Sequence, residues 1–498
     1  MSSVDNLRQQ VISFLQQYDL MSADITLAYS GGCDSQVLLH VLATLKSDKL
    51  LDGHVKAIHV HHGLSSNADD WLSFTERQAK QMNVSYQAVR VNVIRQSRSS
   101  IEAQARQARY QALAEHSSES SVILTAHHVD DQLETMMLAL KRGSGISGLA
   151  AMLPIRDLTI SGDDNVDGLQ RDNQPLSSTS GAQQRQPTTA GSQRLARPLL
   201  TVSRHEIEQY AKHYQLSWVE DESNCDQRFD RNFLRQSVLP TLSQRWPHIA
   251  SSAARAASHL QEAQRLLQEL AEIDYQRCTN DAGHLRVERL QQLSSDRQNN
   301  VLRYVFMRRG LSMPSTAQLQ QIKLQLIAGR SDSQPQIKLT DHIIRRHKKL
   351  LMFTNELADI SDWQIQLAIG DLPQTITLPD GLGQLEVSLV TLADQDVTVL
   401  SRSTQCILPI AQQTESITLD FAYQNSKVWP HFRHKRRDLK KVYQEQQIPS
   451  WQRDRLLNVR INNMLAAVVG VFVNKDYLHS IDNESQASYR CVQIRLLD

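Results

Sequence analysis

The chain has 498 residues, which is too long for one ordinary domain, so we expect about two to four domains. Because the formal net charge is only +1, the whole protein is not a polycation, and any nucleic-acid surface has to be a local patch. The longest apolar run, residues 464–473, is too short to span a bilayer, so we expect no membrane partner. The five cysteines are scattered and form no CxxC pair, so we expect no zinc ribbon and a reducing, cytoplasmic location.

Segments with strand and helix patterns alternate over the first part of the chain. Residues 4–19 have the period of an amphipathic helix. Strands that alternate with helices predict a parallel sheet with crossover helices, which is a Rossmann-like α/β domain. Ligands bind such sheets at the carboxyl ends of the strands. The strand-like runs lie at 25–29, 54–62, 84–93 and 122–127, and the helix-like runs at 36–42, 67–82, 101–116 and 130–140.

The stretch Ser30-Gly31-Gly32-Cys33-Asp34-Ser35 lies between the first strand and the next helix. Its glycines have no Cβ, so the turn can adopt positive φ and let an anion approach the free N–H groups of the helix. Both serines add hydroxyl donors, and Asp34 can hold a metal ion that bridges phosphates. This combination predicts a pyrophosphate cradle, whereas the alternative is an ordinary turn with an Asp or Ser N-cap. We interpret Cys33 as a small filler and not as a nucleophile.

A second polar cluster, His127-His128-Val129-Asp130-Asp131-Gln132-Leu133-Glu134, follows the last of these strands. If a helix begins near Asp130, then Asp130 and Glu134 are one turn apart and Asp131 is beside them. Clustered carboxylates at a strand end can bind Mg²⁺, hold a cationic amine or take its proton. The alternative is that Asp130 and Asp131 only stabilise the helix dipole, but this leaves the paired histidines unexplained.

Three shorter segments have weaker patterns. Arg106 and Arg109 are three residues apart on a predicted helix and can face one phosphate, although helix arginines are more often solvated. Residues 141–149 are glycine-rich, and a helix C-cap with a turn explains them as well as a ligand-binding loop does. The histidines at 59–62 end a predicted strand, at the same edge of the sheet as the two clusters.

The rest of the chain divides by composition. Residues 157–195 are polar and poor in large apolar groups, which predicts a flexible insertion within a first domain at 1–220. Long helical patterns predict a mainly helical middle domain at 221–350. Strand-like runs and turns predict a small α+β region at 351–498.

The densest basic cluster of the chain lies in this last region, at residues 431–441. Arg453 and Arg455 follow it closely, and Trp451 stands beside them as a candidate for stacking on a base. A run of charged residues usually forms only a solvent-exposed surface. The density of this one and its aromatic neighbours favour contact with an RNA backbone.

The motifs and their order along the chain resemble those of the PP-loop ATP pyrophosphatases and, among these, the tRNA(Ile)-lysidine synthase family. SGGCDS at 30–35 matches the signature SGGxDS, which several enzyme classes share. The combination with the other motifs is more specific, and it touches all three predicted domains. The further matching stretches are HVHHGL at 59–64, ARQARY at 105–110, LTAHHVDDQLET at 124–135, LKRGSGISGL at 140–149, RPLL at 197–200, WVEDESN at 218–224, RNFLR at 231–235 and the basic segment 434–455.

The resemblance implies an ATP-dependent ligase that acts in two steps on isoleucine tRNA with a CAU anticodon. ATP activates C2 of the wobble cytidine as an adenylated intermediate, and pyrophosphate leaves. Free L-lysine then attacks C2 through its ε-amine and expels AMP, which gives lysidine. The modified tRNA reads AUA instead of AUG and is charged with isoleucine instead of methionine.

The resemblance also implies roles for individual residues. Residues 30–35 would bind ATP, and Asp34 would hold Mg²⁺. Asp130, Asp131 or Glu134 would position the amine and accept its proton, and the sequence does not divide these tasks among them. Arg106 or Arg109 would hold a phosphate or the lysine carboxylate. A homodimer is compatible with the sequence.

Three other functions compete with this one. A tRNA thiolase on the same scaffold often uses paired cysteines or an iron–sulfur cluster, and the chain has no CxxC pair. An amide-forming synthetase for a small molecule has no need of the basic segment. A tRNA-binding protein without catalytic activity has no need of intact SGGCDS and HHVDD motifs.

Overall fold

The three-dimensional structure is a computed structural model. It describes residues 3–61, 63, 67–91, 101–158, 193–220, 226–329, 335–340, 342–393, 401–402, 404–424, 426–481 and 488–497. The chain divides into two compact units. The first comprises residues 1–277 and 299–305, and the second comprises residues 278–298 and 306–498.

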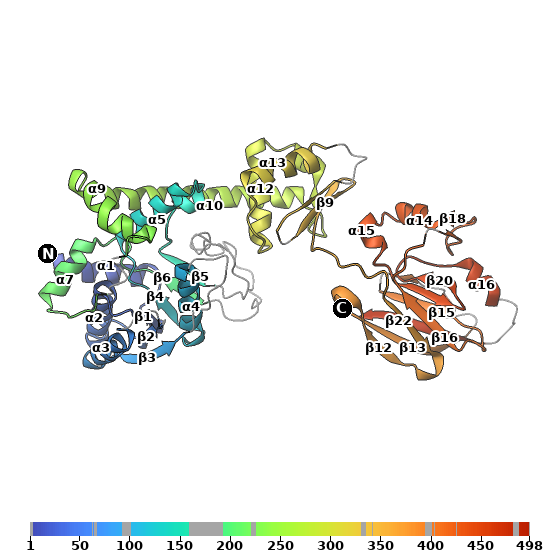
Figure 1. Ribbon diagram of the computed structural model, residues 1–498, viewed down its shortest axis with the longest axis horizontal. Helices are drawn as coiled ribbons and strands as arrows, with labels where there is room; N and C mark the ends of the chain where they lie inside the picture. Colours follow the sequence, from blue (N-terminus) through green and yellow to red (C-terminus); the bar gives the residue numbers. More distant parts are fainter. Residues whose placement is uncertain are drawn as a thin grey trace. The chain divides into compact units, whose positions relative to one another are not determined.

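A six-stranded sheet forms the centre of the first unit, in the order β3-β2-β1-β4-β6-β5 (Figure 1). All neighbours pair in parallel except β5, which runs antiparallel at the edge. The predicted parallel sheet is therefore confirmed, with an antiparallel edge strand added to it. The strands are β1 (Ile25–Ala28), β2 (Val55–His61), β3 (Ser85–Arg90), β4 (Val122–Leu124), β5 (Ile155–Leu158) and β6 (Gln193–Ala196).

Helices cover both faces of this sheet. One buried core joins α1, α2 and α7 to Leu27 of β1, and another joins α4 to Ile58 of β2 and Ile123 of β4. The helix patterns at 67–82, 101–116 and 130–140 are found with their ends within one residue. The helices are α1 (Ser3–Gln17), α2 (Cys33–Ser47), α3 (Ala68–Gln81), α4 (Ile101–Glu115), α5 (Val129–Lys141), α6 (Ile146–Leu149) and α7 (Arg204–His213).

Strand pairing extends into both ends of the segment that composition marks as an insertion, 157–195. β5 ends at Leu158 and β6 begins at Gln193, and these two residues are partners in the antiparallel register. Leu158 and Leu195 are buried. Both ends of the predicted insertion are thus part of the sheet, because they carry buried apolar side chains. Residues 159–192 lie outside the described residues.

A run of helices completes the first unit. Three short segments follow one another, and the middle one is π-helical: α8 (Asp230–Phe233), η2 (Leu234–Val238) and α9 (Leu239–Arg245). The 30-residue helix α10 (Ile249–Cys278) comes next and is the long helix of Figure 1. It begins shortly after Pro247.

The second unit begins with a small four-stranded sheet, in the order β7-β10-β9-β8, and its helices. Arg346 of β9 is buried, and its Nη1 donates to the backbone carbonyls of Leu326 and Gly329 at 3.1 and 2.7 Å. Part of the basic run 345–349 therefore stabilises the fold. The elements are β7 (Leu285–Arg286), α11 (Val287–Gln291), α12 (Ser295–Arg308), α13 (Thr316–Gln321), η3 (Ile322–Ile327), β8 (Gln336–Lys338), β9 (Ile343–His347) and β10 (Leu350–Thr354).

Two five-stranded sheets follow, in the orders β11-β16-β19-β20-β21 and β12-β13-β22-β15-β14. Side chains of both sheets, including Leu385, Val459 and Ile494, share one buried core. The larger strands are β11 (Gln364–Ala368), β12 (Gln374–Thr377), β13 (Gln384–Ala393), β15 (Gln405–Pro409), β16 (Ser416–Asp420), β19 (Asn458–Ile461), β20 (Met464–Val468) and β22 (Ser488–Leu497). The shorter elements are β14 (Ser401–Arg402), β17 (Lys427–Val428), β18 (Arg437–Asp438), α14 (Leu439–Glu445), α15 (Ser450–Arg453), β21 (Phe472–Val473) and α16 (Lys475–Ile481).

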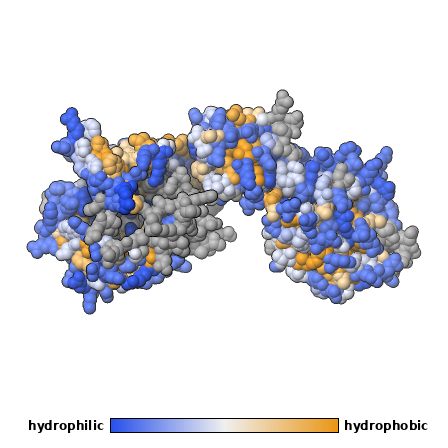
Figure 2. Space-filling view, viewed as in Figure 1, coloured by the Kyte–Doolittle hydropathy of each residue, from blue (hydrophilic) through white to orange (hydrophobic). Residues whose placement is uncertain are grey.

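The apolar run 464–473 forms β20 and β21 of this core. None of the helices formed by the described residues is long and apolar enough to cross a membrane. Figure 2 shows a mainly hydrophilic surface around α14 and β18.

Candidate active site

The loop between β1 and α2 has the geometry that its glycines predict. Gly31 has φ +86°, and a Cβ there would lie 2.7 Å from Cγ2 of Thr75. Its carbonyl accepts a hydrogen bond from the Val219 backbone N–H at 3.0 Å. A side chain is therefore excluded at this position by both conformation and space.

Hydroxyl groups surround the same loop. The Oγ atoms of Ser30 and Ser35 are 3.1 Å apart, and Ser35 Oγ also accepts from the Gly31 N–H at 3.2 Å. Gly32 is the N-cap of α2, with an extended backbone and no side-chain cap. The alternative of an Asp or Ser N-cap is thus wrong for this helix. The first N–H groups of α2 lie beside these hydroxyls, where the positive end of the helix can attract an anion.

Cys33, in the first turn of α2, does not have the properties of a nucleophile. The side chain is buried, and burial together with the charge of Asp34 raises the pKa of its thiol to about 11. A thiol with this pKa is protonated at neutral pH and reacts poorly. This agrees with the interpretation of Cys33 as a filler.

Three neighbouring strands, β1, β4 and β6, deliver the main polar residues of the site. They run parallel, so their carboxyl ends meet at one edge of the sheet. Each is followed by a helix whose first turn supplies one residue: Asp34 of α2, Asp130 of α5 and Arg204 of α7. Side chains about 70 to 170 positions apart in sequence therefore meet, as ligand sites at such sheet edges require.

Asp34 is held by two cationic groups. Arg204 Nη1 donates to its Oδ1 at 2.6 Å, and His128 Nε2 lies 3.8 Å from its Oδ2. Burial raises the pKa of the Asp34 carboxyl, and the charges of His128 and Arg204 oppose this. Asp34 is not the N-cap of α2, so its carboxylate faces its neighbours across the site.

His128 lies at the centre of three carboxylates. Its ring nitrogens are 3.4 Å from Asp130 and 3.6 Å from Asp131, in addition to the contact with Asp34. Burial by itself would lower the pKa of His128, but the three carboxylates outweigh it and raise the pKa to about 9. His128 is therefore an imidazolium at neutral pH.

Asp131 and Glu134 are bound by arginines of the segment 231–235. Arg235 donates from Nη2 to Asp131 Oδ1 at 2.6 Å and from Nε to Glu134 Oε1 at 2.5 Å. Arg231 Nε lies 3.4 Å from Glu134 Oε2. Arg235 belongs to the π-helical turn η2, a kind of turn that occurs often at functional sites.

The pKa values of these carboxyl groups diverge. For Asp131, burial is outweighed by His128, His127 and Arg235, so its pKa is far below the ordinary range. For Glu134, burial and the charge of Asp131 prevail over Arg235, and the pKa is raised. Such divergence is typical of acid–base sites.

Asp130 and Asp131 also stabilise the local backbone. Asp130 Oδ2 accepts from the Arg204 N–H at 3.0 Å, and Asp131 Oδ2 accepts from the His128 N–H at 2.9 Å. For Asp130, burial opposes ionisation, but hydrogen bonds from His128 and Arg204 outweigh it and lower the pKa. The alternative that these two acids only stabilise the start of the helix thus holds in part, since Asp131 completes the N-terminal capping of α5.

The histidine cluster and the arginine pair lie at the same edge. His59 Nδ1 donates to the carbonyl of Tyr29 at 3.0 Å, directly before the loop 30–35. Arg109 is exposed on α4, close enough that its charge contributes to the lowered pKa of His59, whose main cause is burial. Burial likewise lowers the pKa of His127 to about 3, and Arg106 adds to this. His62 lies outside the described residues.

Three residues that contact the predicted acids were not among the candidates: Arg204, Arg231 and Arg235. Arg231 and Arg235 were noted only as part of a resembling motif. Their spacing of four places both on one helix face, which is a signal for a shared ligand. For Arg204 the local signal is the capping box of Ser203 and Glu206, which places this residue at the start of a helix.

The donor set at Asp34 suits one metal in particular. Mg²⁺ is bound by one or two carboxylates together with substrate phosphates and water. Asp34 lies in the first turn after the loop 30–35 and is a carboxylate that could serve this purpose, with Arg204 and His128 on its two oxygens. No group of three or more His, Cys, Asp and Glu side chains in the described parts of the chain is arranged to hold a metal ion on its own.

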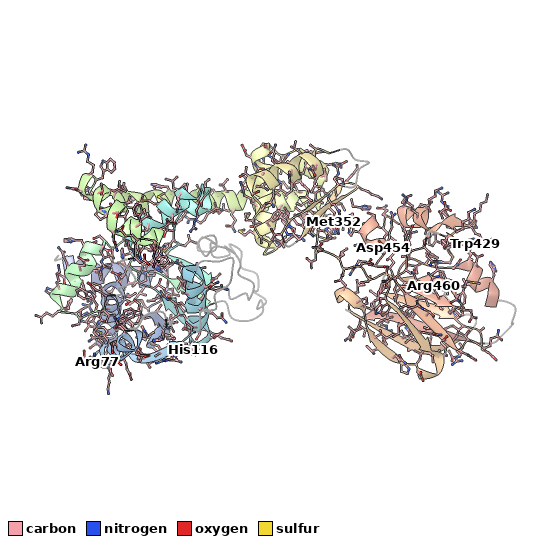
Figure 3. All side chains as sticks on the ribbon, in the orientation of Figure 1. Arg77, His116, Met352, Trp429, Asp454 and Arg460 are labelled. Carbon is pink, nitrogen blue, oxygen red and sulfur yellow. The ribbon has the colours of Figure 1, made fainter. Side chains whose placement is uncertain are left out.

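The basic segment of the second unit contains many ion pairs. Arg433 and Arg437 both pair with Glu445, and Arg436 donates to Asp476 at 2.6 Å. The Trp429 ring has a cation on it, with Lys475 Nζ 5.5 Å from the ring centroid (Figure 3). Phe432 is 43% exposed. Much of the positive charge of the segment is thus balanced by neighbouring acids.

Comparison with known proteins agrees with this geometry. The PP-loop domain family matches residues 4–242, so the first unit contains a PP-loop, ATP-using domain. The TilS substrate binding domain matches residues 285–352, and the TilS substrate C-terminal domain matches residues 417–491.

Relatives of known function match nearly the whole chain. The tRNA(Ile)-lysidine synthase of Actinobacillus pleuropneumoniae serotype 3 is 38% identical over 456 residues, which is 91% of this chain and 96% of that protein. Those of Histophilus somni strain 129Pt and Serratia proteamaculans are each 36% identical, over 94% and 91% of this chain and 99% and 92% of their own lengths. The chain belongs to the tRNA(Ile)-lysidine synthase family, and it is an ATP-using ligase that acts on tRNA.

Proposed function

We propose that this ligase joins free L-lysine to C2 of the wobble cytidine of isoleucine tRNA with a CAU anticodon. In the first step the cytidine O2 attacks the α-phosphorus of ATP, the bond to the β-phosphate breaks and pyrophosphate leaves. In the second step the lysine ε-amine attacks C2, and AMP departs with the former O2. The observation that carries the proposal is the meeting of an anion-binding loop and a carboxylate cluster at one sheet edge, in a chain 38% identical to a lysidine synthase.

Residues 30–35 serve the first step. Their backbone N–H groups and the hydroxyls of Ser30 and Ser35 bind phosphate oxygens, which neutralises charge that develops as pyrophosphate leaves. Asp34 would hold Mg²⁺. When bound, Mg²⁺ neutralises phosphate charge.

The carboxylate cluster serves the second step. Lysine is an ammonium at neutral pH and has to lose a proton before it can attack. Asp131 has a strongly lowered pKa, so it stays ionised and orients the amine. Glu134 has a raised pKa and is the better proton acceptor of the pair. The incoming ammonium takes the place of part of the Arg235 guanidinium on these carboxylates.

Arg109 and Asp130 have supporting roles. Arg109 lies exposed at the same sheet edge and binds either the phosphate of the adenylated cytidine or the lysine carboxylate. Asp130 receives the Arg204 backbone N–H and faces His128, so it fixes the two helices that carry the reacting groups.

Apart from Arg231 and Arg235, which contact the carboxylate cluster, residues 221–350 and 351–498 hold the tRNA away from the chemistry. Trp429, Phe432 and the cations around them are suited to contact a phosphate backbone and an exposed base. Backbone contacts supply affinity, whereas contacts with the anticodon loop and stem supply selectivity. We further propose a cytoplasmic protein that can act as a homodimer.

The reaction is tested with ATP, L-lysine and unmodified isoleucine tRNA. After digestion, mass analysis of the nucleosides should show lysidine, and lysidine, AMP and pyrophosphate should form in equal amounts. Elongator methionine tRNA with the same anticodon is the control and should remain unmodified. Lysidine without ATP consumption, or a sulfur-containing nucleoside, would contradict the proposal.

A further inference from the structure

Arg204 has an unused hydrogen-bonding edge beside the ATP loop. Its Nη1 donates to Asp34 and its Nε donates to Glu208 Oε1 at 3.0 Å. Among the hydrogen bonds of the described residues, none involves its Nη2. The side chain as a whole is 42% exposed.

The position of this guanidinium is well defined. Arg204 is the first residue of α7, and Ser203 caps the helix with the help of Glu206. The Arg204 N–H is bound by Asp130 at 3.0 Å. Two helix starts, those of α5 and α7, therefore fix the backbone of Arg204, and Asp34 of α2 and Glu208 fix its side chain.

Electrostatics favour a phosphate at this place. Asp34 lies in the first turn after Gly32, so Arg204, which contacts the Asp34 carboxylate, is at the same sheet edge as the loop 30–35. That carboxylate alone would repel a polyphosphate. Arg204 neutralises it, and a guanidinium presents five donors in a planar fork that matches phosphate oxygens.

We propose that Arg204 binds the β- and γ-phosphates of ATP, the part that leaves as pyrophosphate. In the protein without ATP it balances the charge of Asp34, and on binding it donates through Nη2 to a phosphate oxygen. The proposal rests on the proposed function, because it requires ATP in the loop 30–35. The alternative is that Arg204 only holds α7 against α2.

The two possibilities differ in their dependence on phosphate length. Binding of MgATP, inorganic pyrophosphate and AMP to the full-length protein is measured by calorimetry without tRNA. The variants are Arg204→Ala, Arg204→Lys and Arg204→Gln, and Arg77→Ala is the control because Arg77 is exposed on α3 (Figure 3). Circular dichroism and melting temperatures show whether each variant is folded.

Arg204→Ala should weaken binding of ATP and pyrophosphate by about 10- to 100-fold, the range for hydrogen bonds to charged groups. AMP binding should change by less than about twofold, because AMP lacks the phosphates concerned, and Arg204→Lys should be intermediate. Unchanged pyrophosphate binding, or equal losses for AMP and ATP, would overturn the assignment. If Arg204→Ala does not fold, Arg204→Gln and Arg204→Lys provide the same comparison.

The proposed function and the Arg204 assignment fail differently. Lysidine formation by the wild type, with pyrophosphate affinity unchanged in folded Arg204 variants, would overturn only the assignment. A wild type that binds ATP but leaves isoleucine tRNA unmodified would overturn the proposed function, and selective loss of pyrophosphate affinity in Arg204→Ala would still support the assignment.

Discussion

Raising the pH should remove the positive charge of His128 and, with it, part of the stability of the first unit. The folded-state pKa of about 9 lies above the ordinary value of 6.5. The stabilisation by the imidazolium is therefore fully present below pH 6.5 and is lost as the pH rises through about 9. Its source is the contact of His128 with Asp34, Asp130 and Asp131.

The size of the effect follows from this pKa difference. At about 1.4 kcal/mol for each pKa unit, the change from 6.5 to about 9 corresponds to about 3 kcal/mol. His128 and Asp131 share one interaction, so this free energy is counted once. For a domain of this size, about 2–4 °C of melting temperature correspond to 1 kcal/mol, so the expected shift is about 6–12 °C.

The assay is differential scanning calorimetry of the wild type and of His128→Gln between pH 6.5 and pH 9.5. Because the chain has several domains, the transition of the first unit is recognised by its upward shift on addition of ATP. The melting temperature of the wild type should fall toward that of His128→Gln as the pH rises. His116→Gln is the control, since His116 contacts the Ala112 carbonyl at the end of α4 (Figure 3). Parallel curves for wild type and His128→Gln would refute the reasoning.

Three further predictions test the site and the RNA contacts. Asp34→Ala should abolish ATP-dependent incorporation of labelled lysine while tRNA binding in a filter assay persists, and full incorporation would refute the role of Asp34. Gly31→Ala should lower the free energy of unfolding by about 1–3 kcal/mol and weaken ATP binding at least about tenfold, because the φ of Gly31 is positive and Thr75 blocks the Cβ. Gly32→Ala is the matched control and should remain folded, because the φ of Gly32 is −74°. Neutralising four cations of the basic segment together should weaken tRNA binding and flatten its dependence on salt, and an unchanged slope would place the RNA contacts elsewhere. The four are Arg433, Lys435, Arg436 and Arg437.

The position of the site could be predicted from the sequence. The alternation of strands and helices implies a parallel sheet, and the motifs at 30–35 and 127–134 each follow a strand, so both belong at one edge. Periodicity also located the helices on either side. These features are local, since they depend on residues a few positions apart.

The ion pairs of the site could not be predicted in this way. Arg204 contacts Asp34 across 170 positions, and Arg235 contacts Asp131 across 104. Such pairs depend on the order of the strands and on the way a later helix returns to the sheet edge, which no local pattern specifies. The same holds for the acids that balance Arg433 and Arg436, because Glu445 and Asp476 approach them through the fold.

These pairs change how the carboxylates are understood. From the sequence, Asp130, Asp131 and Glu134 are equivalent candidates for holding a metal or an amine. In the structure their partners differ, and so do the directions of their pKa shifts: His128, His127 and Arg235 outweigh burial at Asp131, whereas the charge of Asp131 adds to burial at Glu134. This difference supports the proposed roles, in which Asp131 orients the amine and Glu134 accepts its proton.

The central claim is that one site uses ATP to join lysine to the wobble cytidine. The most direct measurement is mass analysis of nucleosides from unmodified isoleucine tRNA with a CAU anticodon, incubated with the protein, MgATP and isotope-labelled L-lysine. The account predicts a cytidine that carries the labelled lysine at a single position, with AMP and pyrophosphate in equal amount. An unmodified cytidine, with ATP and tRNA both bound, would contradict it.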